Sequence, residues 1–137
     1  MIEVEVDAPA DVAGPLEDVV RWVCGRLGVD RASVGLMVVD ADRMAAINRE
    51  HRGKDGPTDV LSFPVDGPDV LAGWPDDGPP PELGDIVICP SRAEEPLETL
   101  AIHGLLHLLG YDHETDEGEM LRLQDVLVDA RGAAEGA

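Results

Sequence analysis

The sequence has few aromatic residues, few basic residues and no long hydrophobic run, and each shortage narrows the classes of protein that it can encode. Two Trp, one Tyr and one Phe occur among 137 residues, so the core must be built from Leu, Val, Ile and Ala. No apolar stretch approaches the ~20 residues of a membrane-spanning helix. The N-terminal residues MIEVEVDAPADV are acidic and alternating, so we expect neither a signal peptide nor a membrane partner.

Cysteine is also scarce. Cys24 and Cys89 are the only two, which is too few for a framework of disulfides. Together with the lack of a hydrophobic run, this predicts a protein of the reducing cytoplasm.

Basic residues are outnumbered by acidic ones, ten against 29, which gives a formal net charge of −19. Such a charge repels phosphates and by itself argues against a nucleic-acid partner. The charge is uneven, however. Residues 43–54 contain four basic side chains and one acidic one, a local net charge of +3. A local positive patch can hold a phosphate when salt screens the rest of the surface.

Apolar residues follow the periods of strands and helices along most of the chain. Alternation and short apolar runs predict strands at 2–6, 33–39, 59–63 and 85–89. Helical spacing predicts a helix from Pro15 to Gly28, a short one capped by Asp40, a third over 96–109 and a last one at about 117–130.

The remaining segments complete the predicted architecture. Ser91 and Glu94 form a possible capping box, residues 66–82 are predicted to be a surface loop, and residues 131–137 a frayed tail. Strands and helices alternate without a strict β-α-β order. The sequence therefore predicts one α+β domain over residues 1–137, with a small mixed sheet of about four strands packed with helices.

The stretch HGLLHLLGYDH, residues 103–113, contains three of the four histidines. His103 and His107 lie one helical turn apart on the same face. Gly110 interrupts the helix and lets His113 reach the same ion. Three neutral imidazoles with one open position are typical of a catalytic zinc site, in which the metal activates water. Iron, nickel or copper also bind imidazole, and ordinary core or capping histidines remain the alternative interpretation.

The spacing is that of the long zincin peptidase motif, H-E-x-x-H-x-x-G-x-x-H, on a zincin-like helix. Gly104 stands where the peptidases have the glutamate that acts as general base. The sequence therefore predicts water activation but does not favour a peptide substrate.

A second stretch, NREHRGKDGPTDVLSFP at residues 48–64, offers groups for a phosphate. The planar fork of Arg52 matches two phosphate oxygens, and Arg52 is the candidate catalytic residue. Lys54 and Arg49 are candidates for further substrate contacts. The alternative is an exposed turn with ordinary charges. Asp85 is a candidate partner for a ligand histidine, or a structural residue at the strand edge.

These motifs, with LGDIVIC at residues 83–89, resemble the YbeY family of metal-dependent endoribonucleases of ribosomal RNA maturation. The resemblance implies one zinc ion on His103, His107 and His113, and a functional Arg52. It also implies cleavage of single-stranded RNA in the maturation and quality control of small-subunit ribosomal RNA. The implied setting is the bacterial cytoplasm, with the small ribosomal subunit and its proteins as partners.

The chain departs from the family pattern in its acidity and in a short segment, PSRAEEPLE, before the histidine helix. A helix that flanks the cleft is expected to be reduced there. Two other functions stay open. One is a ribosome-assembly factor with a structural metal, which the acidic surface suits through basic ribosomal proteins. The other is a metallopeptidase, which Gly104 disfavours.

Overall fold

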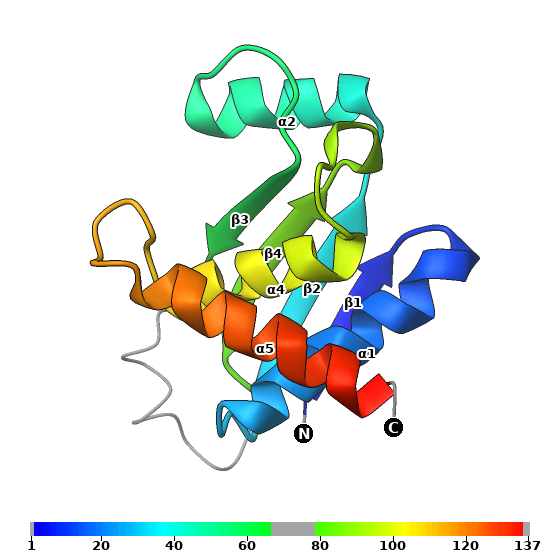
Figure 1. Ribbon diagram of the computed structural model, residues 1–137. Coiled ribbons are helices and arrows are strands. Elements are labelled where there is room, and N and C mark those ends of the chain that lie inside the picture. The colour runs from blue at the N-terminus through cyan, green and yellow to red at the C-terminus, as the bar shows by residue number, and fades with distance from the viewer. Residues whose placement is uncertain (1, 67–78, 136–137) are drawn as a thin grey trace.

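A computed structural model of the chain describes residues 2–66 and 79–135, and a four-stranded sheet lies at its centre (Figure 1). The spatial order is β1-β2-β4-β3. β1 and β2 are parallel, as are β2 and β4, whereas β3 and β4 are antiparallel. The mixed sheet confirms the predicted α+β class. The strands are β1 (Ile2–Asp7), β2 (Ala32–Val38), β3 (Val60–Pro64) and β4 (Glu82–Ile88).

Helices α1, α4 and α5 lie together on one side of the sheet, and α2 lies near one end of it (Figure 1). α4 contacts β3, β4, α1 and α5, so it is the central helix of the larger layer. The helices are α1 (Ala10–Arg26), α2 (Ala41–Arg52), the 3-10 turn η1 (Pro90–Arg92), α4 (Leu97–Leu108) and α5 (Glu119–Glu135).

The sheet separates two apolar cores, because side chains on a strand alternate between its faces. On β4, Ile86 and Ile88 join the larger core with α1, α4 and α5, while Val87 joins a smaller core with Met44 and Ile47 of α2. The face of the sheet on which a β4 side chain lies therefore decides which of the two cores it joins.

Helix α1 begins earlier than predicted. It starts at Ala10, so Pro15 lies inside the helix and not in its first turn. Pro15 lacks the N–H that would bond to the preceding turn, but its fixed φ is helical and its side chain is exposed. The burial of Leu16, Val19 and Val20 stabilises the helix around it. Asp40, in contrast, caps α2 as predicted and accepts from the backbone N–H of Arg43 at 2.8 Å.

Three predicted segments differ in the structure. No side-chain cap of η1 is formed by Ser91, so the capping box is wrong, and η1 is a single 3-10 turn before α4. Helix α5 continues to Glu135, so the helix extends into the predicted frayed tail. Most of the predicted loop 66–82 lies outside the described residues, and Glu82 already belongs to β4.

Two further observations concern the described part of the chain. Cys24 and Cys89 are free and buried, and burial raises the pKa of Cys24 to about 11. No helix there is both long and apolar enough to cross a bilayer.

Candidate metal centre

Helix α4 packs tightly against the sheet, and Gly104 permits the close approach. A Cβ atom at position 104 would lie 2.7 Å from Cγ2 of Ile86, nearer than real Cβ contacts come. A glutamate there would force α4 away from β4. The glycine beside His103 therefore has a packing reason, and position 104 is closed to a general base.

The end of α4 turns the chain back toward the helix. Gly110 has a φ of 99°, which favours glycine. Its N–H donates to the carbonyl of His107 at 3.0 Å, and the N–H of Tyr111 donates to the carbonyl of Leu106 at 3.0 Å. Residue 113 thereby returns to the face of α4 that carries the other two histidines.

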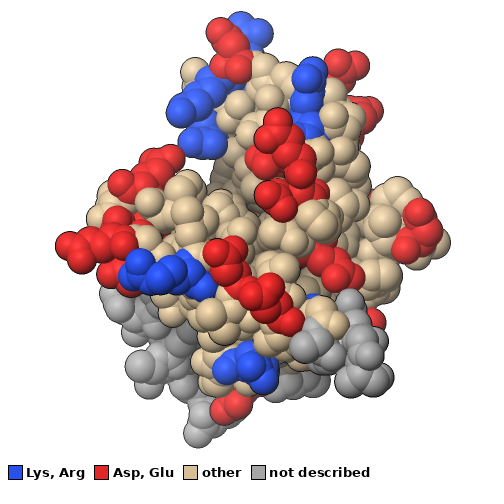
Figure 2. All heavy atoms as spheres, viewed as in Figure 1, with Lys and Arg blue, Asp and Glu red and all other residues tan. Residues whose placement is uncertain are grey.

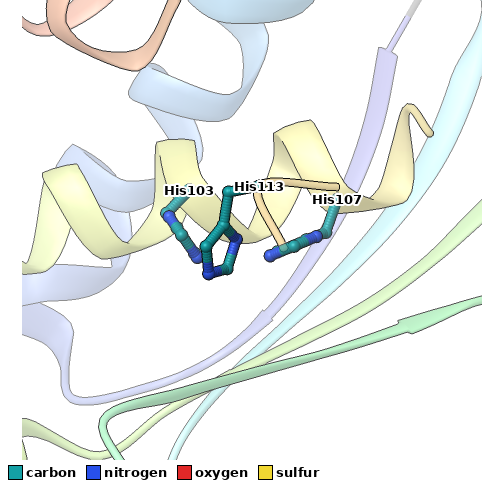
Figure 3. A group of neighbouring side chains, drawn as sticks. All are labelled: His103, His107 and His113. Carbon is teal, nitrogen blue, oxygen red and sulfur yellow. The ribbon is translucent and has the colours of Figure 1, made fainter. Parts of the chain in front are cut away.

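The three histidine rings converge, as Figure 3 shows, with His103 and His107 on α4 and His113 on the segment that follows. Ring centroids are 4.8 Å apart for His103 and His107, and 5.1 Å apart for each pair with His113. One ring nitrogen of each lies within 4.8 Å of the others. Within residues 2–66 and 79–135, no fourth His, Cys, Asp or Glu joins this group.

Two rings are held by oxygen acceptors. His103 Nδ1 lies 2.7 Å from Oε1 of Gln124, and His107 Nδ1 lies 3.0 Å from the carbonyl oxygen of Tyr111. Since a carbonyl oxygen only accepts, each Nδ1 carries a proton, and the lone pair of the neutral ring is then on Nε2. Nδ1 of His113 is buried without a hydrogen-bond partner among the described residues.

The electrostatics favour a neutral ring at His107. Burial, and then the neighbouring His103, lower the pKa of His107 below its usual range. Neutral imidazole is the form that binds metals. Three imidazole nitrogens, on two rings whose Nδ1 atoms face oxygen acceptors and a third nearby, fit a divalent ion that prefers imidazole, and His103, His107 and His113 are the residues that would hold it.

The histidines line a cavity of about 760 Å³ that also includes Arg52 and Ser62. In Figure 2 the surface is indented between the end formed by α2, where Lys and Arg gather, and the loop before α5, where Asp and Glu gather. The cavity thus brings one basic side chain, Arg52, to the same space as the histidine group. The acidic side chains that line it are Asp59, Glu95, Asp112 and Glu114.

Two of these acidic residues support their own loops. Asp59 Oδ1 accepts from the N–H of Val60 at 2.8 Å, and Asp112 Oδ1 accepts from the N–H of Glu114 at 3.0 Å. Their carboxylates are engaged with backbone beside the cavity.

The basic segment is anchored to the fold. Arg52 is the last residue of α2, and Gly53 follows in the left-handed conformation with φ 65°. The side-chain amide of Asn48 donates to the carbonyl of Gly56 at 2.9 Å, which ties the loop to the helix. Lys54 and Arg49 are exposed and do not line the cavity.

The predicted contact between Asp85 and a ligand histidine is wrong. Strand alternation puts Asp85 and Ile86 on opposite faces of β4, and only Ile86 faces α4. Asp85 lines a second cavity of about 580 Å³ on the face that carries α2. His51 lines the same cavity and packs on Phe63 with ring centroids 5.1 Å apart, so it is no fourth ligand.

Known proteins match most of this chain. The family profile of Endoribonuclease YbeY matches residues 4–132. The chain belongs to the YbeY family. Endoribonuclease YbeY of Bacillus subtilis is 41% identical over an alignment that covers 85% of this chain and 84% of that protein. Endoribonuclease YbeY of Salinispora tropica is 40% identical, over 90% of each chain.

A solved structure supports the fold of this YbeY family member. The solution structure of TM1509 from Thermotoga maritima is similar with a TM-score of 0.61 and 29% identity, covering 94% of this chain and 87% of that one. The family resemblance that the motifs predicted is confirmed along the chain.

In this YbeY family member, two hydrogen-bond partners of the candidate ligands are not predicted by the sequence analysis. The partner of His107 is the backbone carbonyl of Tyr111, and a backbone contact cannot be predicted from the type of residue. Gln124 had a signal: it is the only glutamine in the chain, and it lies between the buried Met120 and Leu127 on one stripe of α5. A neutral polar side chain on a buried stripe indicates a hydrogen-bond partner within the fold.

Proposed function

We propose that the protein is a zinc-dependent endoribonuclease that hydrolyses single-stranded RNA in the maturation and quality control of small-subunit ribosomal RNA. The observation that carries the proposal is that three convergent imidazoles and Arg52 line one cavity. The shared family with proteins named endoribonuclease supports RNA as the substrate. Zinc is the proposed ion because a three-histidine set with one open position is its common catalytic arrangement.

Each part of the cavity has a role in this proposal. A bound zinc ion supplies Lewis-acid chemistry, which polarises a phosphoryl oxygen and acidifies water. The guanidinium of Arg52 binds the phosphodiester through two parallel N–H donors and stabilises the negative charge that grows on its oxygens. Lys54 and Arg49 are exposed and lie within three residues of Arg52 in the sequence, and they contact neighbouring phosphates of the RNA strand through their positive charge.

The surface outside residues 43–54 is acidic, which suits a substrate RNA that a larger partner holds in place. With a formal net charge of −19, the chain repels RNA except near α2. We propose that basic proteins of the small ribosomal subunit bind the acidic surface and present RNA to the cavity, which would place the protein in the cytoplasm.

Two alternatives are less well supported. A structural metal normally has four protein ligands, whereas three candidate ligands group together among the described residues. A metallopeptidase needs a base beside the first histidine, and the contact of position 104 with Ile86 leaves no room for one.

The test is to measure metal content and RNA cleavage on the same purified protein. We expect one zinc per chain, endonucleolytic cuts in single-stranded RNA, loss of cleavage with chelator and recovery when zinc is restored. Analysis of the new ends identifies the nucleophile, since a 2′,3′-cyclic phosphate would indicate attack by the RNA's own hydroxyl. Zinc binding without cleavage would favour the assembly factor, and cleavage that persists without metal would contradict the proposal.

A further inference from the structure

Gln124, a side chain of α5, hydrogen-bonds a candidate metal ligand. Its Oε1 lies 2.7 Å from Nδ1 of His103, and the residue lines the cavity. α5 is fixed in place on both sides of it, because Met120 is fully buried and Leu127 is 3% exposed in the larger core. The position of Gln124 is thus set by packing between α5 and the rest of the fold.

The hydrogen bond defines which nitrogen of His103 is available. Oε1 has no proton to donate, so Nδ1 must carry one, and the lone pair is on Nε2. The carbonyl of Tyr111 does the same for His107. His107 is therefore oriented by the backbone of the turn that follows it, and His103 by a side chain that is 21 residues away in the sequence.

We propose that Gln124 is a positioning residue for the metal centre. It fixes the Nδ1–H tautomer and the ring orientation of His103, and it does so without adding negative charge. This inference rests on the proposed function, in which the three histidines hold a metal. Partners of ligand histidines are often carboxylates. A neutral partner leaves the positive charge of the centre intact in a cavity that four carboxylates already line, and the substrate there is an anion.

The experiment compares Gln124→Leu and Gln124→Glu with wild type and with the control Asp125→Leu. Asp125 is the next residue of α5, is exposed and does not line the cavity, so its replacement tests the effect of a leucine on this helix away from His103. Zinc affinity is measured by competition with a chromophoric chelator. We expect Gln124→Leu to bind zinc about 10- to 100-fold more weakly, with Gln124→Glu at least as tight as wild type and Asp125→Leu unchanged.

A second readout does not involve zinc or RNA. In the metal-free protein, ¹⁵N NMR of the histidine rings reports the tautomer of each imidazole. We expect His103 to be protonated at Nδ1 in wild type and to lose this preference in Gln124→Leu, while His107 keeps its own. This readout also serves if Gln124→Leu does not fold, because an Nε2–H tautomer of His103 in wild type would by itself overturn the inference.

The outcomes separate the two proposals. If wild type binds no zinc, the proposed function fails. If wild type binds zinc and Gln124→Leu binds it equally well, the role of Gln124 is wrong and the metal centre stands. If Gln124→Glu binds as weakly as Gln124→Leu, the side chain acts by packing and not as an acceptor, which also overturns the inference.

Discussion

The hydroxyl of Ser62 donates a hydrogen bond to the carbonyl oxygen of Gly104 at 3.1 Å, and so joins β3 to the middle of α4. The contact is possible because residue 104 has no side chain, and Ile86 of β4 occupies the space that a Cβ would need. His103 and His107 precede and follow Gly104 on α4. The distance between α4 and the sheet therefore sets the position of both rings in the cavity.

Gly104→Ala should therefore destabilise the protein, although alanine is the better helix former. The added methyl group meets Ile86, and overpacking of this kind costs about 1–3 kcal/mol in the free energy of unfolding. Gly25→Ala is the matched control, because Gly25 is also helical and nothing lies within 4 Å of the place that its methyl group would take. It should stabilise the protein by about 0.5–1 kcal/mol. Chemical denaturation of both variants measures the difference, and equal effects would contradict the packing argument.

The second prediction uses the fourth histidine as a control. His107→Ala removes one of three donors, so stoichiometric zinc binding and RNA cleavage should both be lost. His51→Ala removes a histidine that packs on Phe63 in the other cavity, and zinc content should not change. Metal analysis after dialysis against a weak chelator checks both. Retention of zinc by His107→Ala would show that the ion binds elsewhere.

Arg52→Ala should slow cleavage and leave the metal content unchanged. Removing one donor from a site that stabilises developing negative charge costs about 100-fold in kcat. Arg52→Lys keeps the charge but not the fork, so an intermediate rate is expected. Arg43→Ala is the matched control, because Arg43 is on the same helix but lines the other cavity. An Arg52→Ala variant that cleaves at the wild-type rate would remove this residue from the mechanism.

The grouping of the three histidines could be predicted from the sequence, because its information is local. His103 and His107 are one helical turn apart, and Gly110 marks the reversal that returns His113, so 11 consecutive residues specify the group. Arg52 was predicted less directly, through the chemistry of a basic loop, and the structure brings it to the same cavity.

The errors arose where distant parts of the chain meet. Asp85 was misassigned because a strand residue faces either side depending on which helices cover the sheet, and the sequence of β4 does not contain that information. Gln124 was missed because its partner is on another helix. The prediction of a helix start at Pro15 follows the local preference of proline for the first turn. It fails because the burial of Leu16 and Val19, which depends on the packing of α1 against the rest of the fold, outweighs that preference.

The last prediction concerns the start of α5, which holds Gln124. Asp116 caps it: Oδ1 accepts from the N–H of Gly118 at 2.8 Å and Oδ2 from that of Met120 at 2.9 Å. These hydrogen bonds lower the pKa of Asp116 below its usual 3.8. Because the folded pKa is the lower one, the cap stabilises the protein fully above pH 3.8, and this contribution is lost as the pH falls through 3.8 toward the folded pKa.

Asp116→Asn should consequently melt at a lower temperature than wild type near neutral pH. The two melting temperatures should converge in acid, once the wild-type carboxylate is protonated. Thermal unfolding of both proteins from about pH 7 to about pH 2.5, with chelator present throughout, measures the gap. A gap that stays constant over this range would mean that the charge of Asp116 contributes nothing, and that the cap of α5 depends on hydrogen-bond geometry alone.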